Sequence, residues 1–416
     1  MAVMAAPESY RLSPLHKLWR LLPAQRRRSM LTRATALLAP AIDREPLPAA
    51  GGLVVAGDLS GATGLGEGAR LMLGALTRLG VPAWPMDTGA TGSGPDADGG
   101  GAALPPGAPL VLHVNAPMLP MALLRLPRRT ARGRRVIGYW AWELPSVPPD
   151  WAIGAGFVHE IWVPSRFTAA AVESLLPGRV RVVPHPLAIS PPVPSRLDRL
   201  AFGLPDDAVV ILVSLNLASS LERKNPYAAI AAFREAFGDR PDRVLVLKVG
   251  NPSHFPSEFA QLAEAAAAPN IRLETRTLKR ADNYALIAAA DIVLSLHRSE
   301  GFGLVPAEAM LLGKPVIATG WSGNMDFMDG ENSALVGYRL VPAHDPRGVY
   351  EVASAVWAEP DQADAVAHLR RLADDATARQ ALGQRACEAA MARLGVDALA
   401  EAVRSLGLPV PGSTVV

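Results

Sequence analysis

Short β-branched runs alternate with helix-type segments along most of this chain, and the alternation occurs twice. The first series of strand-type runs comprises Leu53–Ala56, Leu110–Val114, Arg135–Tyr139, Glu160–Val163 and Val180–Val183. The second comprises Val209–Val213, Val244–Val249, Ile271–Glu274, Ile292–Leu296 and Val316–Thr319. Strands that alternate with helices form parallel sheets that are covered on both faces. The sequence therefore predicts an α/β fold with two doubly wound, Rossmann-like domains.

A proline cluster separates the two series. Five prolines lie between residues 184 and 194, and this density resists both helix and central strand. We therefore place the domain boundary there. The predicted parts are an N-terminal basic helical segment (residues 1–50), a first Rossmann-like domain (51–190), a second one (198–385), and a C-terminal helix and tail (386–416).

The overall composition excludes several classes of protein. The 416 residues carry 41 Lys and Arg against 39 Asp and Glu, without the basic excess of a dedicated nucleic-acid binder. The single cysteine, Cys387, excludes an internal disulfide framework and a multi-cysteine metal site, and it fits a reducing compartment. No apolar stretch is long enough to predict a spanning helix, and the N-terminus lacks the pattern of a secretory signal.

The N-terminal segment combines apolar and basic residues. Leu15–Leu22 contains four leucines and one tryptophan, and Arg26–Arg28 follows it. A basic helix with Trp and Leu on one face can lie on an anionic membrane surface, which would place the protein on the inner face of a membrane. Alternatively, the helix packs on its own domain with the arginines in solvent.

The segment Ser295–Met310 has the strongest candidate site pattern. A strand-type run ends in polar residues, the turn Gly301-Phe302-Gly303 follows, and a helix begins near Pro306. Glycines allow backbone N–H groups to come close to a ligand. Glu300 precedes the turn and Glu308 follows it, so both carboxylates would face one crevice and accept hydrogen bonds from sugar hydroxyls. The alternative is an ordinary strand-to-helix turn with solvated glutamates.

Two cations lie where a helix is expected to begin after the strand that ends near Leu215. Arg223 and Lys224 precede Pro226, although a helix N-terminus favours anions. A bound diphosphate would resolve this conflict, whereas the alternative is a solvated cation pair. Lys248, at the end of another strand, is a weaker candidate for the same phosphates.

Two glycine loops are further candidates. Gly61–Gly66 approximates a dinucleotide-binding fingerprint, but we expect no acidic residue to close a second strand at the required distance, because Met86-Asp87-Thr88 runs into a Gly-rich loop. We interpret Gly64 and Gly66 as a backbone wall of the cleft. The loop Ala318–Asp326 would also present N–H groups to a diphosphate. For both loops, a glycine turn without a ligand is an equal alternative.

No metal site is predicted. Asp96 and Asp98 match an acidic metal-binding pattern, but they lie in a Gly-rich stretch away from any strand end. The histidines are dispersed, without the spacing of a zinc site. The cluster Trp140–Glu143 fits a core position, and its glutamate also fits a place in the cleft.

Together these segments resemble a bacterial subgroup of the family 4 retaining glycosyltransferases, which have GT-B architecture. Glu300 to Glu308 is similar to the E-x7-E signature of that family. The resemblance covers most of residues 52–345, and it is more specific on the C-terminal side. The resembling stretches are Ser295–Leu304, Gly320–Met328, Arg223–Pro226, Gly138–Pro145 and Trp162–Phe167.

The resemblance implies two domains that face a central cleft, with a nucleotide sugar on the C-terminal domain and the acceptor mainly on the N-terminal one. By position, Glu300 and the backbone of Gly301–Gly303 would contact the transferred sugar. Glu308 would bind the ribose hydroxyls, and Arg223 and Lys224 would bind the diphosphate. The resemblance also implies retention by front-face attack, in which the leaving phosphate accepts the proton. Lys224 would then serve catalysis as well as binding.

Two departures from the family pattern qualify these assignments. Many members have a Gly-Arg pair after the first strand of the C-terminal domain, whereas Ser214–Leu217 contains no arginine. One phosphate contact would then be either absent or supplied by Lys248. Many members also place a histidine beside the reacting sugar, where this chain has Tyr139–Trp142, so we assign that role to no histidine.

The expected function is a cytoplasmic-side transfer of a hexose, mannose first, from a nucleotide-diphosphate sugar to a surface glycan or lipid-linked oligosaccharide. The donor would be a GDP- or UDP-sugar, with no tightly bound cofactor or metal and no nucleic-acid partner. One alternative is a non-catalytic GT-B module that binds nucleotide or glycan in an assembly complex. Another is a Rossmann oxidoreductase that uses Gly61–Gly66.

Overall fold

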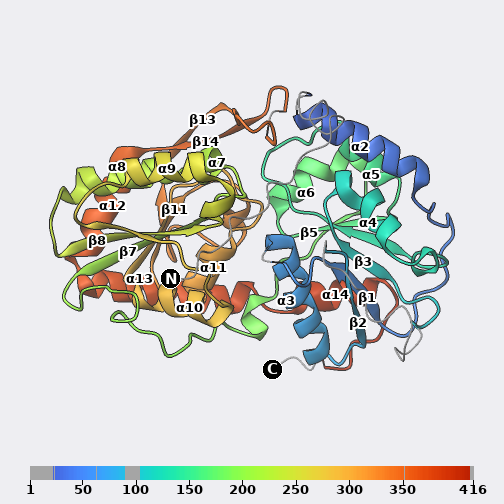
Figure 1. Cartoon of the computed structure of the whole chain (residues 1–416). Helices are drawn as coiled ribbons and strands as arrows, with labels where there is room; N and C mark the ends of the chain where they lie inside the picture. Colours follow the sequence, from blue (N-terminus) through green and yellow to red (C-terminus); the bar gives the residue numbers. More distant parts are fainter. Residues whose placement is uncertain (1–21, 23, 62, 90–103, 351, 413–416) are drawn as a thin grey trace, which may run out of the picture.

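The computed structural model describes residues 22, 24–61, 63–89, 104–350 and 352–412, which form two lobes (Figure 1). The N-terminal lobe is built on six parallel strands in the order β2-β1-β3-β4-β5-β6. They are β1 (Leu53–Gly57), β2 (Ala83–Asp87), β3 (Leu110–His113), β4 (Val136–Tyr139), β5 (Glu160–Val163) and β6 (Val180–Val182). The helices are α2 (Ala24–Leu38), α3 (Gly64–Arg78), α4 (Leu119–Arg125), α5 (Trp151–Ala155) and α6 (Arg166–Val172).

The C-terminal lobe has a second sheet of six parallel strands, in the order β12-β11-β10-β7-β8-β9. They are β7 (Val209–Asn216), β8 (Arg243–Gly250), β9 (Ile271–Glu274), β10 (Ile292–Ser295), β11 (Val316–Thr319) and β12 (Ala334–Val336). The helices are α7 (Leu221–Lys224), α8 (Pro226–Phe237), α9 (Pro256–Ala265), α10 (Arg280–Ala289) and α11 (Leu304–Leu311). Short 3₁₀ turns connect these elements in both lobes.

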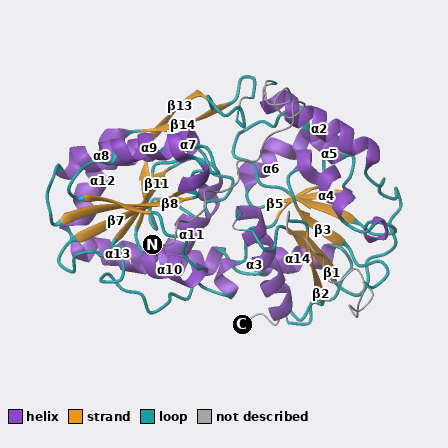
Figure 2. Ribbon diagram, viewed as in Figure 1, coloured by secondary structure: helices purple, strands orange, loops and turns teal. Residues whose placement is uncertain are grey.

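Both faces of the second sheet are buried, which explains why its strands are continuous apolar runs. In β7, Ile211 and Val213 belong to the core on one face, whereas Val210 and Leu212 belong to the core on the other. Figure 2 shows helices on both sides of each sheet. The prediction of an α/β fold with two Rossmann-like domains is confirmed.

Strand β2 corrects the expectation of a loop at Met86-Asp87-Thr88, because Met86 and Asp87 belong to the strand and Asp87 ends it. The strand pairs only with β1 and contains Pro85. A proline cannot donate to a sheet ladder and is therefore confined to edge strands. An edge strand with a proline has a weak sequence pattern, so this strand is visible only in the structure.

An antiparallel hairpin is also absent from the sequence prediction. It consists of β13 (Tyr338–Pro342) and β14 (Val356–Pro360), and it extends from the C-terminal lobe toward the N-terminal one (Figure 1). Tyr350 and Ala355, from the connection, and Trp357, from β14, join the hydrophobic core of the N-terminal lobe. The hairpin therefore ties the two lobes together.

Three C-terminal helices follow, as predicted: α12 (Gln362–Asp374), α13 (Ala376–Arg393) and α14 (Asp397–Ser405). Helix α14 returns to the N-terminal lobe, where Leu399 and Val403 pack in the same core as Val55 and Met72. Helix α13 spans residues 385 and 386, between which the sequence places the end of the second domain. The predicted domain limits remain predictions.

Within the described residues, none of the helices combines the length and the apolar character needed to cross a membrane. Two sequence-based expectations lie outside the described residues. These are the discounted metal pattern of Asp96 and Asp98, and most of the amphipathic segment that begins at Leu15.

Candidate functional site

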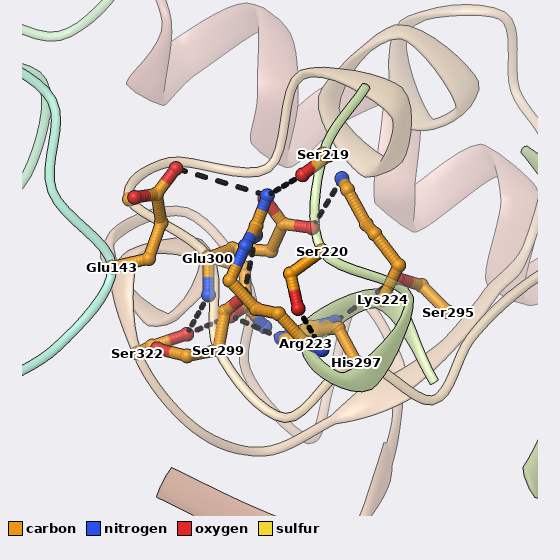
Figure 3. A network of polar contacts seen from close by, with 12 residues as sticks. Glu143, Ser219, Ser220, Arg223, Lys224, Ser295, His297, Ser299, Glu300 and Ser322 are labelled. Atoms are coloured by element: carbon orange, nitrogen blue, oxygen red, sulfur yellow. Dashed lines mark hydrogen bonds and ion pairs between the residues drawn. The ribbon is translucent and has the colours of Figure 1, made fainter. Parts of the chain in front are cut away.

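The site is centred on the carboxylate of Glu300, which follows β10 and is only 7% exposed. Its Oε1 lies 2.6 Å from Nζ of Lys224, and its Oε2 lies 3.1 Å from Nη1 of Arg223 (Figure 3). Glu143, from the N-terminal lobe, lies 3.7 Å from Nη2 of the same arginine. We call Glu143, Arg223, Lys224 and Glu300 the Glu300 cluster; it brings together the predicted cations and one of the two predicted carboxylates.

The charges in this cluster fix the ionisation state of Glu300. Burial of its carboxyl raises the pKa, but the charges of Lys224 and Arg223 outweigh this effect and lower the pKa to about 2. Glu300 is therefore an anion at neutral pH. As an anion it can neutralise the two cations in the free protein and can accept hydrogen bonds from hydroxyl groups of a ligand.

Local backbone structure positions the two cations. The hydroxyl of Ser220 caps α7 by accepting from the backbone N–H of Arg223, at 3.2 Å. The helix ends at Asn225, which is left-handed with a φ of 50°. Pro226 then begins α8. This tight turn holds Arg223 and Lys224 over the carboxyl ends of the strands, where ligands bind in doubly wound sheets.

The arginine of this pair is deeply buried: only 4% of Arg223 is exposed. It donates to the carbonyl of Ser299 at 2.7 Å and to the hydroxyl of Ser219 at 2.7 Å. Its Nε and the hydroxyl of Ser299 are buried without a hydrogen-bond partner among the described residues. Buried donors are rarely left unpaired, so these two atoms are exceptions in the interior beside Glu300.

The turn Gly301-Phe302-Gly303 needs its glycines for two different reasons. A Cβ on Gly301 would lie 3.1 Å from the carbonyl oxygen of Trp142, in the opposite lobe. Gly303 has a φ of 99°, a conformation that other residues rarely adopt. Phe302 has a structural role, because its ring packs in the core against His185 and Phe327. Only its backbone remains available for a donor sugar.

The loop after β11 supports Glu300 directly. Glu300 donates its backbone N–H to the hydroxyl of Ser322 at 2.8 Å, and its carbonyl accepts from Gly323 at 2.9 Å. Ser322 adopts a φ of 82°, which is unusual for a residue with a side chain. The sequence predicts that this loop faces a diphosphate. It does not reveal that Ser322 holds the backbone of Glu300.

The N-terminal lobe holds the turn in place through hydroxyl groups. Ser165, which caps α6, donates to the carbonyl of Gly301 at 2.6 Å, and Thr168 donates to the same carbonyl at 3.3 Å. At the rim of this contact, Arg166 pairs with Asp326 at 3.2 Å. The opposite lobe therefore helps to fix the backbone that would contact the donor.

Glu308 lies apart from these cations, on α11. Its carboxyl forms a hydrogen bond with Tyr284, and burial raises its pKa to about 7 although Arg280 and Tyr284 act in the opposite direction. Arg280 also pairs with Glu67 of the N-terminal lobe. The predicted role of Glu308 toward a ribose remains a prediction.

Three other predicted site residues have protein partners of their own. Lys248 is buried, and its ammonium donates to the carbonyl of Arg276 at 2.7 Å, so the structure does not bring it into the Glu300 cluster. Gly64 begins α3 and faces Leu304, whereas a Cβ on Gly66 would lie 2.2 Å from the carbonyl oxygen of Asp58. Close packing therefore explains Gly66, and the donor roles of all three remain predictions.

The described residues contain no group of three or more His, Cys, Asp or Glu side chains that could hold a metal ion. The rings of His113 and His185 both lie against the ring of Tyr139, in the interior of the N-terminal lobe. Burial lowers the pKa of His185 to about 4, so it is neutral at physiological pH. The tyrosine hydroxyl donates to the carbonyl of Val183 at 2.8 Å.

Residues 209–358 match the family model of glycosyl transferases group 1. This part of the chain, which we call the group 1 region, is similar to that family. It contains three of the four members of the Glu300 cluster, and only Glu143 lies outside it. The group 1 region lies within the lobe in which the sequence predicts the donor site.

Curated relatives match over part of their length. The D-inositol 3-phosphate glycosyltransferase of Kineococcus radiotolerans is 31% identical over 244 residues, which cover 54% of this chain and 51% of the relative. That of Thermobispora bispora is 33% identical over 220 residues, which cover 49% of each chain. The chain therefore spans about half the length of the curated relatives that it matches.

Solved structures match over nearly the whole chain at low identity. HepE of Anabaena in complex with UDP and glucose has a TM-score of 0.59 and 16% identity, and the match covers 86% of this chain and 99% of HepE. Sucrose-phosphate synthase of Thermosynechococcus elongatus has a TM-score of 0.60 and 16% identity, with coverage of 85% and 98%. These likenesses confirm the predicted GT-B fold; the E-x7-E assignment and the residue roles remain predictions.

Proposed function

We propose that this protein is a retaining hexosyltransferase. It transfers a hexose, mannose first, from a nucleotide-diphosphate sugar to a surface glycan or a lipid-linked oligosaccharide. The donor is a GDP- or UDP-sugar, and the reaction needs no tightly bound metal. The names of the curated relatives and the UDP bound to HepE support a glycosyltransferase that uses a nucleotide donor.

The observation that carries this proposal is the Glu300 cluster, three of whose four members lie in the group 1 region. In the free protein, Glu300 forms ion pairs with both Arg223 and Lys224, and its carboxylate lies next to the turn Gly301–Gly303. When a donor binds, its diphosphate takes over the charge of Lys224, which is more exposed than Arg223. Glu300 is then free to accept hydrogen bonds from the sugar.

The chemistry follows from this exchange of partners. The bond between the anomeric carbon and the diphosphate oxygen breaks, and the electron pair remains on the diphosphate. Lys224 stabilises the developing charge from a fixed position in a low-dielectric site, where such stabilisation is strong. The leaving phosphate accepts the proton of the acceptor hydroxyl, and attack from the same face retains the anomeric configuration.

We also propose that the protein works on the cytoplasmic side, in peripheral contact with a membrane. Helix α2 supports this, since Leu37 is 88% exposed and Leu38 is 69% exposed, close to the exposed arginines Arg26 and Arg33. An exposed helix with leucines and arginines is suited to an anionic lipid surface. Co-sedimentation with vesicles that contain anionic lipids tests this part of the proposal.

The experiment that tests the function is a thermal-shift panel of GDP-, UDP- and ADP-sugars, followed by an assay of nucleotide release. We expect one nucleotide class to raise the melting temperature and its sugar to be cleaved. Glu300→Gln should abolish cleavage, whereas Glu331→Gln, an exposed glutamate of the same lobe, should not. A wild-type protein that binds none of the donors would overturn the proposal. Donor binding without any cleavage would favour a non-catalytic module.

A further inference from the structure

Glu143 lies in the N-terminal lobe, outside the group 1 region, and its side chain approaches Arg223 of the other lobe. It follows β4, at the carboxyl end of the first sheet, and its side chain is 20% exposed. Figure 3 shows Glu143 and Lys224 on opposite sides of the Arg223 head group. The N-terminal lobe thus contributes a carboxylate to a cluster whose other members all lie in the C-terminal lobe.

The contact between Glu143 and Arg223 is too long to be a hydrogen bond. The closest atoms, Oε1 of Glu143 and Nη2 of Arg223, are 3.7 Å apart. By comparison, the ion pair between Arg298 and Glu359 has a distance of 2.7 Å. Among the described residues, no donor lies within hydrogen-bond distance of Oε1 of Glu143. A carboxylate oxygen accepts two hydrogen bonds, so this atom retains unused capacity. A purely structural ion pair would use it.

Tyr350, from the hairpin connection, holds the other oxygen. Its hydroxyl donates to Oε2 of Glu143 at 3.1 Å, and its ring packs against Trp142 with centroids 5.3 Å apart. The guanidinium of Arg223 lies 5.5 Å from the centre of the same ring. Because Tyr350 is only 6% exposed, this arrangement fixes the direction in which Oε1 points.

The electrostatic surroundings select a neutral ligand for this oxygen. Burial raises the pKa of Glu143, against the charge of Arg223, so its carboxylate is a stronger hydrogen-bond acceptor than an exposed one. Glu143 and Glu300 both repel anions on their side of the arginine. A hydroxyl group of a sugar donates a hydrogen bond without adding charge, and it fits both conditions.

We propose that Glu143 forms the subsite for the acceptor hydroxyl, and that Tyr350 is a positioning residue for it. This rests on the proposed function. Oε1 accepts a hydrogen bond from an acceptor hydroxyl next to the attacking one, and this aims the attacking oxygen at the anomeric carbon beside Glu300. The new bond joins that oxygen to the anomeric carbon, the bond to the diphosphate breaks, and the hydroxyl proton goes to the departing phosphate. The reacting part of the acceptor is therefore a neutral polyol.

The test compares Glu143→Ala, Glu143→Gln and Tyr350→Phe with the wild type and with Glu173→Gln, an exposed glutamate of the same lobe. Release of nucleotide from the donor is measured alone and with methyl α-mannoside, methyl α-glucoside or myo-inositol. The affinity for GDP and UDP and the melting temperature are measured in parallel. We expect one of these polyols to stimulate the wild type.

Glu143→Ala should lose about 100-fold of this stimulated rate, in the range of a lost catalytic hydrogen bond. Glu143→Gln should retain part of it, because its amide oxygen still accepts, and Tyr350→Phe should raise the KM for the polyol with little change in kcat. Nucleotide affinity should stay unchanged in all variants. An equal fall in nucleotide affinity and stimulated rate would show a structural latch instead, and lack of stimulation by every polyol would also overturn the subsite. Absence of any donor cleavage by the wild type would overturn the proposed function itself.

Discussion

The two lobes share one architecture but contribute to the site in different ways. In the C-terminal lobe, charged side chains from two neighbouring strand-to-helix turns meet at distances of 2.6 to 3.1 Å. The N-terminal lobe contributes two hydroxyl groups and one carboxylate, Glu143, whose nearest cation is 3.7 Å away. The comparison suggests that the C-terminal lobe is organised for charge, as a diphosphate requires, and the N-terminal lobe for orientation.

The distribution of charge follows the same division. Residues 1–190 carry 19 Lys and Arg against 12 Asp and Glu, whereas residues 191–416 carry 22 against 27. The near-neutral total charge is therefore the sum of a basic N-terminal half and an acidic C-terminal half. A basic half is typical of proteins that contact anionic surfaces, which agrees with the proposed membrane contact of this lobe.

The largest effect is expected for Glu300→Gln. The transfer rate should fall by about 1000-fold, as for the loss of a key electrostatic contact. The free energy of unfolding without ligand should also fall by about 3 kcal/mol, because the buried Arg223 and the partly buried Lys224 lose a counter-charge. Nucleotide release and chemical denaturation measure the two effects. A variant with normal activity would show that Glu300 is only a structural partner of the cations.

Lys224→Gln should have the next largest effect. The affinity for the nucleoside diphosphate should fall about tenfold and kcat about 100-fold, because Lys224 contacts the diphosphate more strongly as its charge develops. Titration with the nucleotide and steady-state kinetics separate the two. A fall in affinity with kcat unchanged would assign Lys224 to binding alone.

The double variant Ser165→Ala/Thr168→Val tests the contribution of the N-terminal lobe to the donor turn. We expect transfer to fall about tenfold with little loss of nucleotide affinity, since misplacement of the turn affects alignment more than binding. Arg166→Ala is the matched control. Its side chain is 75% exposed, and exposed ion pairs contribute little. Equal effects of the two changes would contradict a specific role of the hydroxyls.

The smallest effect is expected from the titration of Glu308. Its pKa of about 7 means that it is protonated at pH 6 and ionised at pH 8. A carboxylate accepts hydrogen bonds from ribose hydroxyls better than a carboxylic acid does. Nucleotide affinity should therefore rise severalfold from pH 6 to pH 8. Calorimetric titration measures this affinity, and the rise with pH should be absent in Glu308→Gln, which cannot ionise. A variant with the same pH profile as the wild type would exclude Glu308 from the ribose site.

Features with a local sequence pattern were predictable. The strands β5 and β9 have the predicted limits, and the contact between the Arg223–Lys224 pair and Glu300 follows from the rule that ligands bind at the carboxyl ends of parallel strands. The apolar runs and glycine turns that signal these elements lie within a few residues of each other.

Features that depend on distant partners were not predictable. Tyr350 reaches Glu143 only because the hairpin β13–β14 crosses to the other lobe. Both strands of this hairpin are edge strands, so their sequence pattern is weak. Lys248 has the residue type and strand position of a phosphate ligand, but the carbonyl of Arg276 binds its ammonium. Nothing local to Lys248 reveals that competitor.

A crystal structure of the protein with the nucleoside diphosphate that it binds best is the most direct test of the central claim. We expect the diphosphate on the C-terminal lobe, within hydrogen-bond distance of Nζ of Lys224 and of the backbone N–H groups of Gly301–Gly303. The carboxylate of Glu300 should have released that lysine. A diphosphate bound instead at Gly61–Gly66, with the Lys224–Glu300 contact intact, would contradict the account.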